Sequence, residues 1–505
     1  MKKKEKKEEK LHEENSKELV KIKDKKSANE VLKKWLAKTS LTAIIIAIII
    51  AAYIGLNYFL EKAKLTDIDL TKEKVYSLTD TSKEFLKNIE QNVDVILINM
   101  NEFAQAVIDL SYQYNKANEN IKIKEVEDVS QEPELASKYN LSDETCLIII
   151  KSGEKEKILT SGNLYTYDYT TGQQKDTAEE AITNAILDVT ITEKPKVYYL
   201  SNHMRYADYM YWFFEDLKSE ANEVEALDLL TKGKVPDDAS VLIITTLTED
   251  ITGPEKDAII KYIKNGGKLA VFSDANAGNL KLTNFQKVLD QYGVQISNGI
   301  MLEQDTNKML ASFPSAILPS VNQSSSIMNQ KNMNVSACFI NAGKLTFKDD
   351  EKLDELGVEV ETLMTTSSTS FYRSDLNIQS ISKQEKDEEG SQTVGALITK
   401  KINEDKSSKL IIFSNNMFIT NVAIEVYEDS YLYALDFYHN EDIALNSIAY
   451  LTGREDMVTI RKNAEITSYT ITAKEQNIIL TIIFVVPAVI IITGIVVWQV
   501  RRRKK

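Results

Sequence analysis

The sequence is poor in the residues on which disulfide-stapled, collagen-like and low-complexity chains depend. Its 505 residues include only 2 Cys, 7 Pro and 17 Gly, while 43% are hydrophobic. Two cysteines form at most one bridge, and so little proline and glycine excludes collagen-like and disordered chains. Histidine is also scarce at 3 residues, which excludes a metal site built from several histidines. The length leaves room for about three folded units.

Negative charge dominates the body of the chain but not its ends. The first 40 residues hold 14 Lys against 8 acidic residues, and the last five residues are all basic. Residues 61–476 carry 42 Lys and Arg against 67 Asp and Glu. So acidic a body repels phosphate backbones, and we therefore expect no nucleic-acid binding.

Two uncharged hydrophobic stretches lie near the two ends of the chain. Residues 41–60 read LTAIIIAIIIAAYIGLNYFL, and residues 477–499 read NIILTIIFVVPAVIIITGIVVWQ. At about 1.5 Å per helical residue, each is long enough to cross the hydrocarbon core of a bilayer. The first follows a long charged segment and is followed by no small-x-small cleavage site, which favours an uncleaved anchor over a signal peptide.

Basic residues flank both stretches on the sides nearer the chain ends, as the positive-inside rule expects of cytoplasmic segments. We predict a two-pass cell-membrane protein with both termini cytoplasmic and the bulk extracytoplasmic. The predicted parts are a charged tail at 1–40, transmembrane helices at 41–60 and 477–499, outer domains at 61–190 and 191–455, a juxtamembrane segment at 456–476 and a basic tail at 500–505.

The first outer domain alternates strands and helices. Thr79 or Asp80 is placed to cap a helix, and VDVILIN and IKIKEVE read as strands with a helix between them. A further helix covers 133–139, a hairpin turns at Ser152 and Gly153, and a last helix covers 178–190. This βαβαββ order is typical of a thioredoxin-like fold. Because the sequence contains no CxxC, thioredoxin-type redox chemistry is excluded.

The second outer domain reads as a doubly wound α/β unit. KVYYL, SVLIITT and KLAVFSD are predicted strands, and an aromatic-rich helix is predicted at 206–217. Thr252 and Glu255 have the spacing of a capping box, and Gly266 and Gly267 end the helix that it starts. Such strand–helix–strand units predict parallel neighbouring strands. After a less regular stretch, the strands VGALITK and KLIIFSN and a helix at 441–451 follow.

Known catalytic motifs are missing from the sequence. It contains no GxxxxGK[ST], GxSxG, HExxH or GxGxxG. We therefore predict no catalytic residues, no metal site and no cofactor.

The most suggestive polar residues follow two predicted parallel strands, where open α/β sheets bind their ligands. The candidate ligand- or partner-binding residues are His203, Arg205, Asp208, Asp274 and Asn276. The alternative is that these side chains cap helices and solvate loops.

Several segments match a known pattern in their order along the chain. They are DLTKEKVYSLTDTSKEFL after the first hydrophobic stretch, ITNAILDVTITEKPKVYYLSNH, LTEDITGPEKDAIIKYIKNGGKLAVFSD and ALNSIAYLTGRED. Together with the second hydrophobic stretch and the terminal RRRKK they resemble the GldG-like family, auxiliary components of an ABC transporter first named for gliding motility. The resemblance covers roughly residues 40–505.

The resemblance implies that the second outer domain is similar to a class I glutamine amidotransferase without a catalytic nucleophile. The predicted fold class is then a membrane-anchored α/β protein, in which a thioredoxin-like and an amidotransferase-like domain lie between two transmembrane helices. The resemblance also implies an ABC permease and a cytoplasmic ATPase as partner subunits. The leading hypothesis is a non-enzymatic extracytoplasmic transporter subunit that binds a substrate or partner. An extracellular envelope-acting hydrolase and a ligand sensor are the alternatives.

Overall fold

The computed structural model divides into two compact units, Met1–Leu70 and Thr71–Lys505. The residues that it describes are 51, 54–55, 77–100, 105–142, 145–168, 173–275, 280–328, 335–374, 382–427, 430–454 and 464–465. The predicted span at 477–499 lies outside these residues, as does all of 41–60 except Ala51, Ile54 and Gly55. Within the described residues, no helix combines the length and apolar character needed to cross a bilayer.

The first described part is built on a four-stranded sheet. The sheet order is β2-β1-β3-β4, in which β1 pairs parallel with β2 and antiparallel with β3. Its elements are α2 (Asp80–Lys87), β1 (Val93–Ile98), α3 (Gln105–Ala117), β2 (Ile121–Val126), α4 (Pro133–Tyr139), β3 (Leu147–Ser152), β4 (Lys155–Thr160) and α6 (Ala178–Thr190). The predicted βαβαββ order and final helix are therefore confirmed. A short sheet of β5 (Tyr165–Asp168), β6 (Gln173–Asp176) and β24 (Ala464–Glu465) adjoins them.

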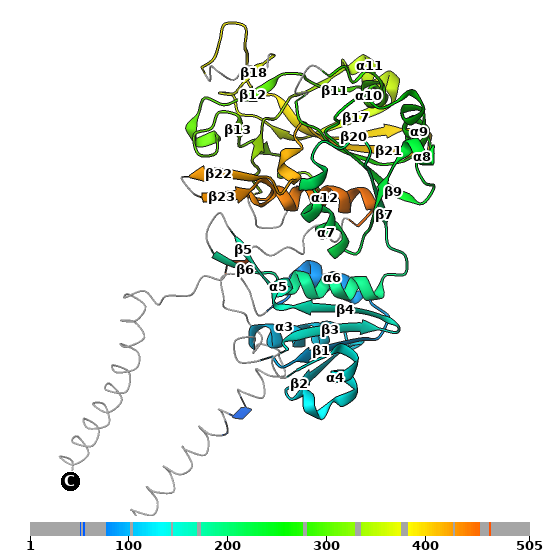
Figure 1. Ribbon diagram of the computed structural model, residues 1–505, viewed down its shortest axis with the longest axis vertical. Helices are drawn as coiled ribbons and strands as arrows, with labels where there is room; N and C mark the ends of the chain where they lie inside the picture. The colour runs from blue at the N-terminus through cyan, green and yellow to red at the C-terminus, as the bar shows by residue number, and fades with distance from the viewer. Residues whose placement is uncertain are drawn as a thin grey trace, which may run out of the picture. The chain divides into compact units, whose positions relative to one another are not determined.

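Local sequence accounts for the boundaries of these elements. The Thr79 hydroxyl caps α2 by accepting a hydrogen bond from the backbone of Ser82 at 3.2 Å, as the sequence predicts. The β3–β4 hairpin turns at Gly153, whose φ of +59° is costly for any residue with a Cβ. Both faces of the sheet are buried, one under α2, α3 and α6 and the other under α4. Figure 1 shows α6 and α4 on opposite sides of it.

The second described part is dominated by an eight-stranded sheet of order β14-β17-β20-β21-β10-β9-β7-β8. Five strands are parallel, namely β8 (Glu223–Leu227), β7 (Lys196–Leu200), β9 (Ala239–Thr245), β10 (Leu269–Phe272) and β21 (Ser407–Phe413). The antiparallel strands β20 (Thr393–Lys401), β17 (Val358–Thr365) and β14 (Ser320–Val321) extend the sheet beyond β21.

Helices cover both faces of the parallel strands, as a doubly wound sheet requires. Along β9, Val241 and Ile243 point to one hydrophobic core, while Leu242 and Ile244 point to the other. The first core is covered by α7 (Tyr211–Ser219) and α12 (Asn440–Thr452), and the second by α9 (Gly253–Lys264) and α10 (Thr283–Leu289). These helix pairs lie on opposite sides of the sheet in Figure 1.

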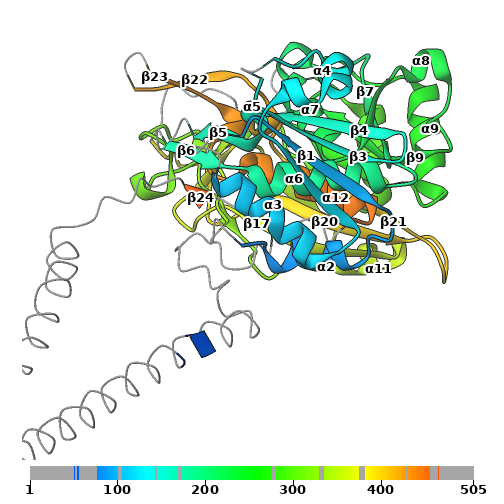
Figure 2. The same ribbon diagram turned by 90° about the horizontal axis from the view of Figure 1, so that it is seen from below.

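Small sheets and helices complete this part of the chain. They are α8 (Leu229–Lys232), β11 (Val294–Ile296), β12 (Ile300–Leu302), β13 (Ala316–Ile317), β15 (Phe339–Ile340), β16 (Leu345–Phe347), α11 (Asp350–Leu356), β18 (Phe371–Arg373), β19 (Glu388–Glu389), β22 (Ala423–Tyr427) and β23 (Ser430–Tyr433). The β22–β23 hairpin projects from the main sheet in both Figure 1 and Figure 2.

The structure corrects the predicted helix at 206–217. A 3₁₀ turn, η4 (Ala207–Tyr209), comes first, and α7 begins only at Tyr211. The reason is that Met204 forms an antiparallel bridge with Leu247, so the chain leaves β7 extended and turns before it can become helical. Strand β8, for which no prediction was made, is an edge strand with only Leu227 buried, so it lacks the apolar run of a central strand.

Candidate functional site

The ends of β7, β9, β10 and β21 meet at one edge of the sheet, which we call the carboxyl edge. The loop after β7 lies along the loop after β9, because the Arg205 N–H donates to the Thr246 carbonyl at 2.9 Å. The Thr248 N–H donates in turn to the His203 carbonyl at 2.9 Å. The loops after β7 and β9 are therefore held next to each other by backbone hydrogen bonds.

His203 lies at this edge but is an internal anchor. The residue is 3% exposed, and its Nε2 lies 3.0 Å from Oε1 and 3.1 Å from Oε2 of Glu255. Glu255 is the third helical residue of α9 and accepts a hydrogen bond from the Thr252 N–H at 2.7 Å, which completes the predicted capping box. His203 thus ties the loop after β7 to the start of α9.

The environment of Glu255 favours its charged form. Burial raises the pKa of this carboxyl, but hydrogen bonds from Asn202 and Thr252 and the charge of His203 together lower the pKa below its ordinary value of 4.5. The Asn202 amide donates to Oε1 at 2.7 Å. The pair therefore stabilises the fold while Glu255 is ionised.

Replacing Glu255 with glutamine should lower the free energy of unfolding by about 1–3 kcal/mol, since the charge-assisted bonds to His203 and Thr252 are weakened. A carboxyl with a lowered pKa stabilises the fold above its ordinary pKa of 4.5, and this contribution is lost as the pH falls through the lowered value. Denaturation of both proteins from pH 7 to pH 3 should show the difference shrinking with acid. Glu249→Gln is the control, because the Glu249 side chain is 73% exposed and 3.5 Å from the His203 ring; an equal loss there would contradict the assignment.

Asp274 lies directly after β10, where the sequence places it, and is 7% exposed. Its Oδ1 accepts the N–H groups of Asn416 at 2.6 Å and Met417 at 3.3 Å, and its own N–H donates to the Thr246 hydroxyl at 2.9 Å. Burial raises the pKa of the Asp274 carboxyl despite these donors. Burial and the neighbouring Asp274 raise the pKa of Tyr206 to about 12.

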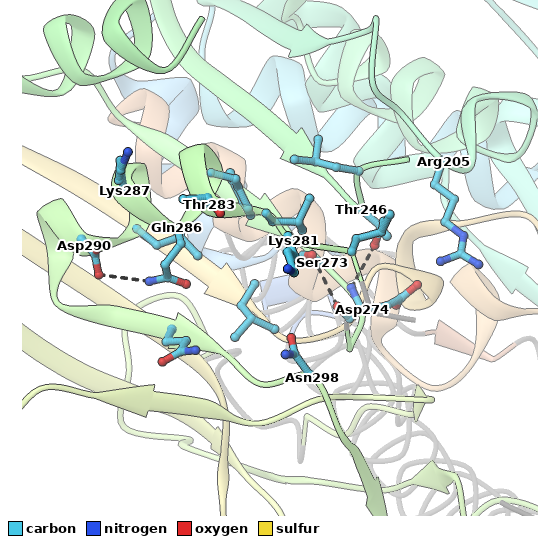
Figure 3. Close-up of a pocket in the computed structure, with 17 residues that line it drawn as sticks. Arg205, Thr246, Ser273, Asp274, Lys281, Thr283, Gln286, Lys287, Asp290 and Asn298 are labelled. Atoms are coloured by element: carbon cyan, nitrogen blue, oxygen red, sulfur yellow. Dashed lines mark hydrogen bonds between the residues drawn. The ribbon is translucent and has the colours of Figure 1, made fainter. Parts of the chain in front are cut away.

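A cavity of about 590 Å³ opens between the carboxyl edge and α10. We call it the Arg205 cavity, and Figure 3 shows the side chains around it. Its wall includes the polar residues Arg205, Thr246, Ser273, Asp274, Lys281 and Asn298. A volume of this size is typical of sites for small molecules.

The structure brings together two of the five predicted site residues. Arg205 and Asp274 line the Arg205 cavity, whereas His203 is buried behind it against Glu255. Asp208 is exposed on η4 and is not among the residues of the cavity wall that the structure describes. Asn276 lies outside the described residues. A ligand- or partner-binding role of His203 stays a prediction, and its ring is engaged with a carboxylate 52 residues away.

Most residues of the described wall were not predicted from the sequence, among them the polar residues Thr246, Ser273, Lys281 and Asn298. Thr246 and Ser273 directly follow β9 and β10, so the strand-end rule that selected Asp274 also applies to them. Lys281 and Asn298 come from the segments before α10 and after β11. Lys281 and Asn298 reach the cavity wall only because α10 packs on the sheet. The local sequence around them does not predict this packing.

Two side chains at the carboxyl edge, those of Thr245 and Asn416, are buried with unpaired polar atoms. The Thr245 hydroxyl and both polar atoms of the Asn416 amide have no hydrogen-bond partner in the described part of the chain. Native structures rarely bury such groups, which cost free energy. This edge is therefore not arranged for stability alone.

The Arg205 cavity presents groups on its described wall that can bind a ligand. Its described wall contains hydroxyls, amides and charged groups but neither His nor Cys. The described residues also contain no group of three or more His, Cys, Asp or Glu side chains arranged to hold a metal ion. The described wall therefore has no imidazole that could accept a proton from Thr246 or Ser273. It also has no thiol that could act as a nucleophile.

Several solved structures are similar to about half of this chain. The mmIFT52 N-terminal domain is 14% identical, with a TM-score of 0.37 over 51% of this chain and 96% of that one. A protein from Bacteroides uniformis described as ThuA-like is 16% identical, with a TM-score of 0.32 over 52% and 93%. A protein from Thermoplasma acidophilum described as part of a GMP synthase is 9% identical, with a TM-score of 0.27 over 52% and 98%.

No curated protein matches this chain. The model of one protein family, described as an ABC-type uncharacterized transport system, matches residues 194–447. The match includes the parallel strands from β7 to β21. It also includes Arg205, in the loop after β7, and Asp274, in the loop after β10. The match agrees with the resemblance found in the sequence, and the chain belongs to this family of auxiliary components of ABC-type transport systems.

Proposed function

We propose that this chain is a non-enzymatic, membrane-anchored subunit of an ABC-type transporter, and that its extracytoplasmic domains bind a substrate or partner. The observation that carries the proposal is the family match over residues 194–447, which contain the Arg205 cavity. The two uncharged stretches at 41–60 and 477–499, with basic residues on their outer sides, support anchoring at both ends. A separate ATPase and a multi-span permease then complete the transporter.

The proposal includes a thioredoxin-like first domain and an amidotransferase-like second domain. The strand order β2-β1-β3-β4 with parallel β1 and β2 supports the first. The order β8-β7-β9-β10-β21, with helices on both faces, supports a doubly wound second domain. Neither free cysteine, Cys146 or Cys338, lies between a strand end and a following helix as an amidotransferase nucleophile does.

The hydrogen-bond partners of His203 and Asp274 favour a binding function over a hydrolase function. His203 is held by Glu255, and Oδ1 of Asp274 accepts two backbone N–H groups. A general base must present a lone pair to the substrate, whereas His203 is 3% exposed and is not part of the described cavity wall. In the proposed mechanism, nucleotide-driven movement of the permease reaches the outer domains through the two anchors.

Affinity purification of the tagged full chain from detergent-solubilised membranes should recover a multi-span permease and an ATPase in fixed proportion. Mass spectrometry of the eluate measures both, and an unrelated two-pass protein with the same tag is the control. Recovery of neither partner, or equal recovery with the control, would count against the transporter assignment.

Protease added to intact cells should cleave the chain between the two hydrophobic stretches, because the proposal places residues 61–476 outside the membrane. An antibody to each terminus follows the fragments on a blot. The topology is wrong if the middle of the chain survives on intact cells and is cut only after lysis.

A further inference from the structure

We propose that the Arg205 cavity binds a small soluble organic anion through a carboxylate or phosphate group. This inference deepens the proposed function, on which it rests for its biological setting, by naming the class of ligand.

Positive charge exceeds negative charge on this wall, although the chain as a whole has a net charge of -14. The cations are Arg205, Lys281 and Lys287, and the acids are Asp274 and Asp290. Within the part of the chain that the structure describes, neither Arg205 nor Lys281 forms an ion pair. The charge of Arg205 also acts on Asp274, but the cations on the described wall outnumber the acids and therefore attract an anion.

The acidic residues of the wall are engaged with the protein. Asp274 accepts the N–H groups of Asn416 and Met417, and Asp290 accepts the Gln286 amide at 3.1 Å and lies 3.9 Å from Lys348. These partners compensate both carboxylates. Lys281 can therefore act on a ligand that enters the cavity, and Arg205 can act on both the ligand and Asp274.

The donors are arranged to meet an oxygen-rich ligand. The Arg205 guanidinium lies 5.7 Å from the centre of the Tyr206 ring, a cation–π contact that positions it without using its N–H donors. The Thr246 hydroxyl oxygen accepts the Asp274 N–H, so its own proton is directed elsewhere. Figure 3 shows Arg205, Thr246, Lys281 and Asn298 around the same hollow. Arginine forks and hydroxyls recognise carboxylates and phosphates in proteins.

The size of the cavity selects an organic ligand over a bare ion. About 590 Å³ is far more than one phosphate fills, and it falls in the range of small-molecule sites. The apolar part of the wall, formed by Leu247, Phe285 and Ile296, can contact the carbon skeleton of the ligand. The expected ligand therefore pairs at least one anionic group with a carbon skeleton.

The test is calorimetric titration of the purified full chain with succinate, inorganic phosphate and glucose. We expect saturable binding of succinate, of phosphate or of both, which identifies the preferred anionic group, and none of glucose. Arg205→Gln should weaken anion binding by about tenfold to a hundredfold, as expected for loss of a charged hydrogen bond. Lys281→Gln should weaken it less. Lys264→Gln is the matched control, because Lys264 is exposed at the end of α9 and is not part of the described wall.

Equal binding by Arg205→Gln, Lys281→Gln and the unaltered chain would overturn the inference, as would binding of glucose or of none of the three probes. Circular dichroism confirms that each variant is folded, and both side chains are exposed enough to be replaced without opening the core. Failure here is separate from failure of the proposed function, because permease and ATPase recovery is measured independently. A chain that purifies with both partners but binds no anion refutes the ligand class alone.

Discussion

Replacing Arg373 with methionine should lower the free energy of unfolding by about 3–5 kcal/mol, because a buried carboxylate loses its cation. Arg373 ends β18, and its Nε and Nη2 donate to the two oxygens of Asp387 at 3.2 and 2.6 Å. The two side chains are 0% and 1% exposed. Nη2 also donates to the Ser382 carbonyl at 2.9 Å, and the Gln384 N–H donates to Asp387 at 2.8 Å.

Urea unfolding of the full chain measures the loss. The double variant Arg373→Met with Asp387→Leu should recover most of it, since removing both charges leaves none buried. Lys218→Met is the control, because the Lys218–Glu215 pair is solvent-exposed and such pairs contribute about 1 kcal/mol or less. If the single variant loses no more than this control, the Arg373–Asp387 pair does not stabilise the fold as its burial indicates.

The stabilisation that the Arg373–Asp387 pair provides should decrease in acid. The hydrogen bond from Arg373 lowers the pKa of Asp387 below its ordinary value of 3.8. The stabilisation is therefore complete above that value and disappears as the pH falls through the lowered pKa. The difference between the unaltered chain and Arg373→Met should accordingly be largest near neutral pH and smallest in acid.

Replacing Phe272 with alanine should cost about 3–5 kcal/mol of unfolding free energy, as expected for a large aromatic removed from a packed core. Phe272 is 0% exposed at the end of β10. Its ring stacks on Phe413 at 5.9 Å between centroids and lies 5.7 Å from Phe418. Phe418 belongs to the turn η7 (Met417–Ile419), and the Met417 N–H donates to Asp274. Removing the Phe272 ring should therefore also weaken the hydrogen bonds at the carboxyl edge.

Hydrogen exchange followed by mass spectrometry separates the two consequences. Protection of the amides of β9, β10 and β21 measures the stability of the core. Protection of the Asn416 and Met417 amides measures the stability of their hydrogen bonds to Asp274. Phe313→Ala is the matched control, since Phe313 is 50% exposed and such substitutions change stability by about 0.5 kcal/mol or less. Similar exchange in the two variants would contradict the packing described for Phe272.

Much of the fold follows from local sequence rules. The capping box of Thr252 and Glu255 and the hairpin at Gly153 are confirmed because their determinants lie within a few residues. The strands β9, β10 and β21 are continuous apolar runs, which identifies them as central parallel strands. Strand β8 and the turn η4 depend on contacts with distant segments, so periodicity does not reveal them.

The same distinction applies to the candidate site. The strand-end rule places Arg205 and Asp274 on the cavity wall, because parallel strands bring their ends to one edge whatever the side chains. It does not reveal the contact of His203 with Glu255 on α9, because that contact depends on tertiary packing. Lys281 is likewise supplied by tertiary packing, since it joins the wall through the position of α10.

The position of β10 has a consequence for biosynthesis. Leu269 of β10 pairs with Leu242 on one side and with Leu410 on the other, so its second neighbour is made long after it. At the usual 5–20 residues per second, the ribosome needs on the order of 10 s to supply β21. During that interval the apolar segment LAVF has one unpaired edge, which is a template for wrong strand pairing. Chaperone capture of nascent chains should accordingly peak between synthesis of β10 and synthesis of β21.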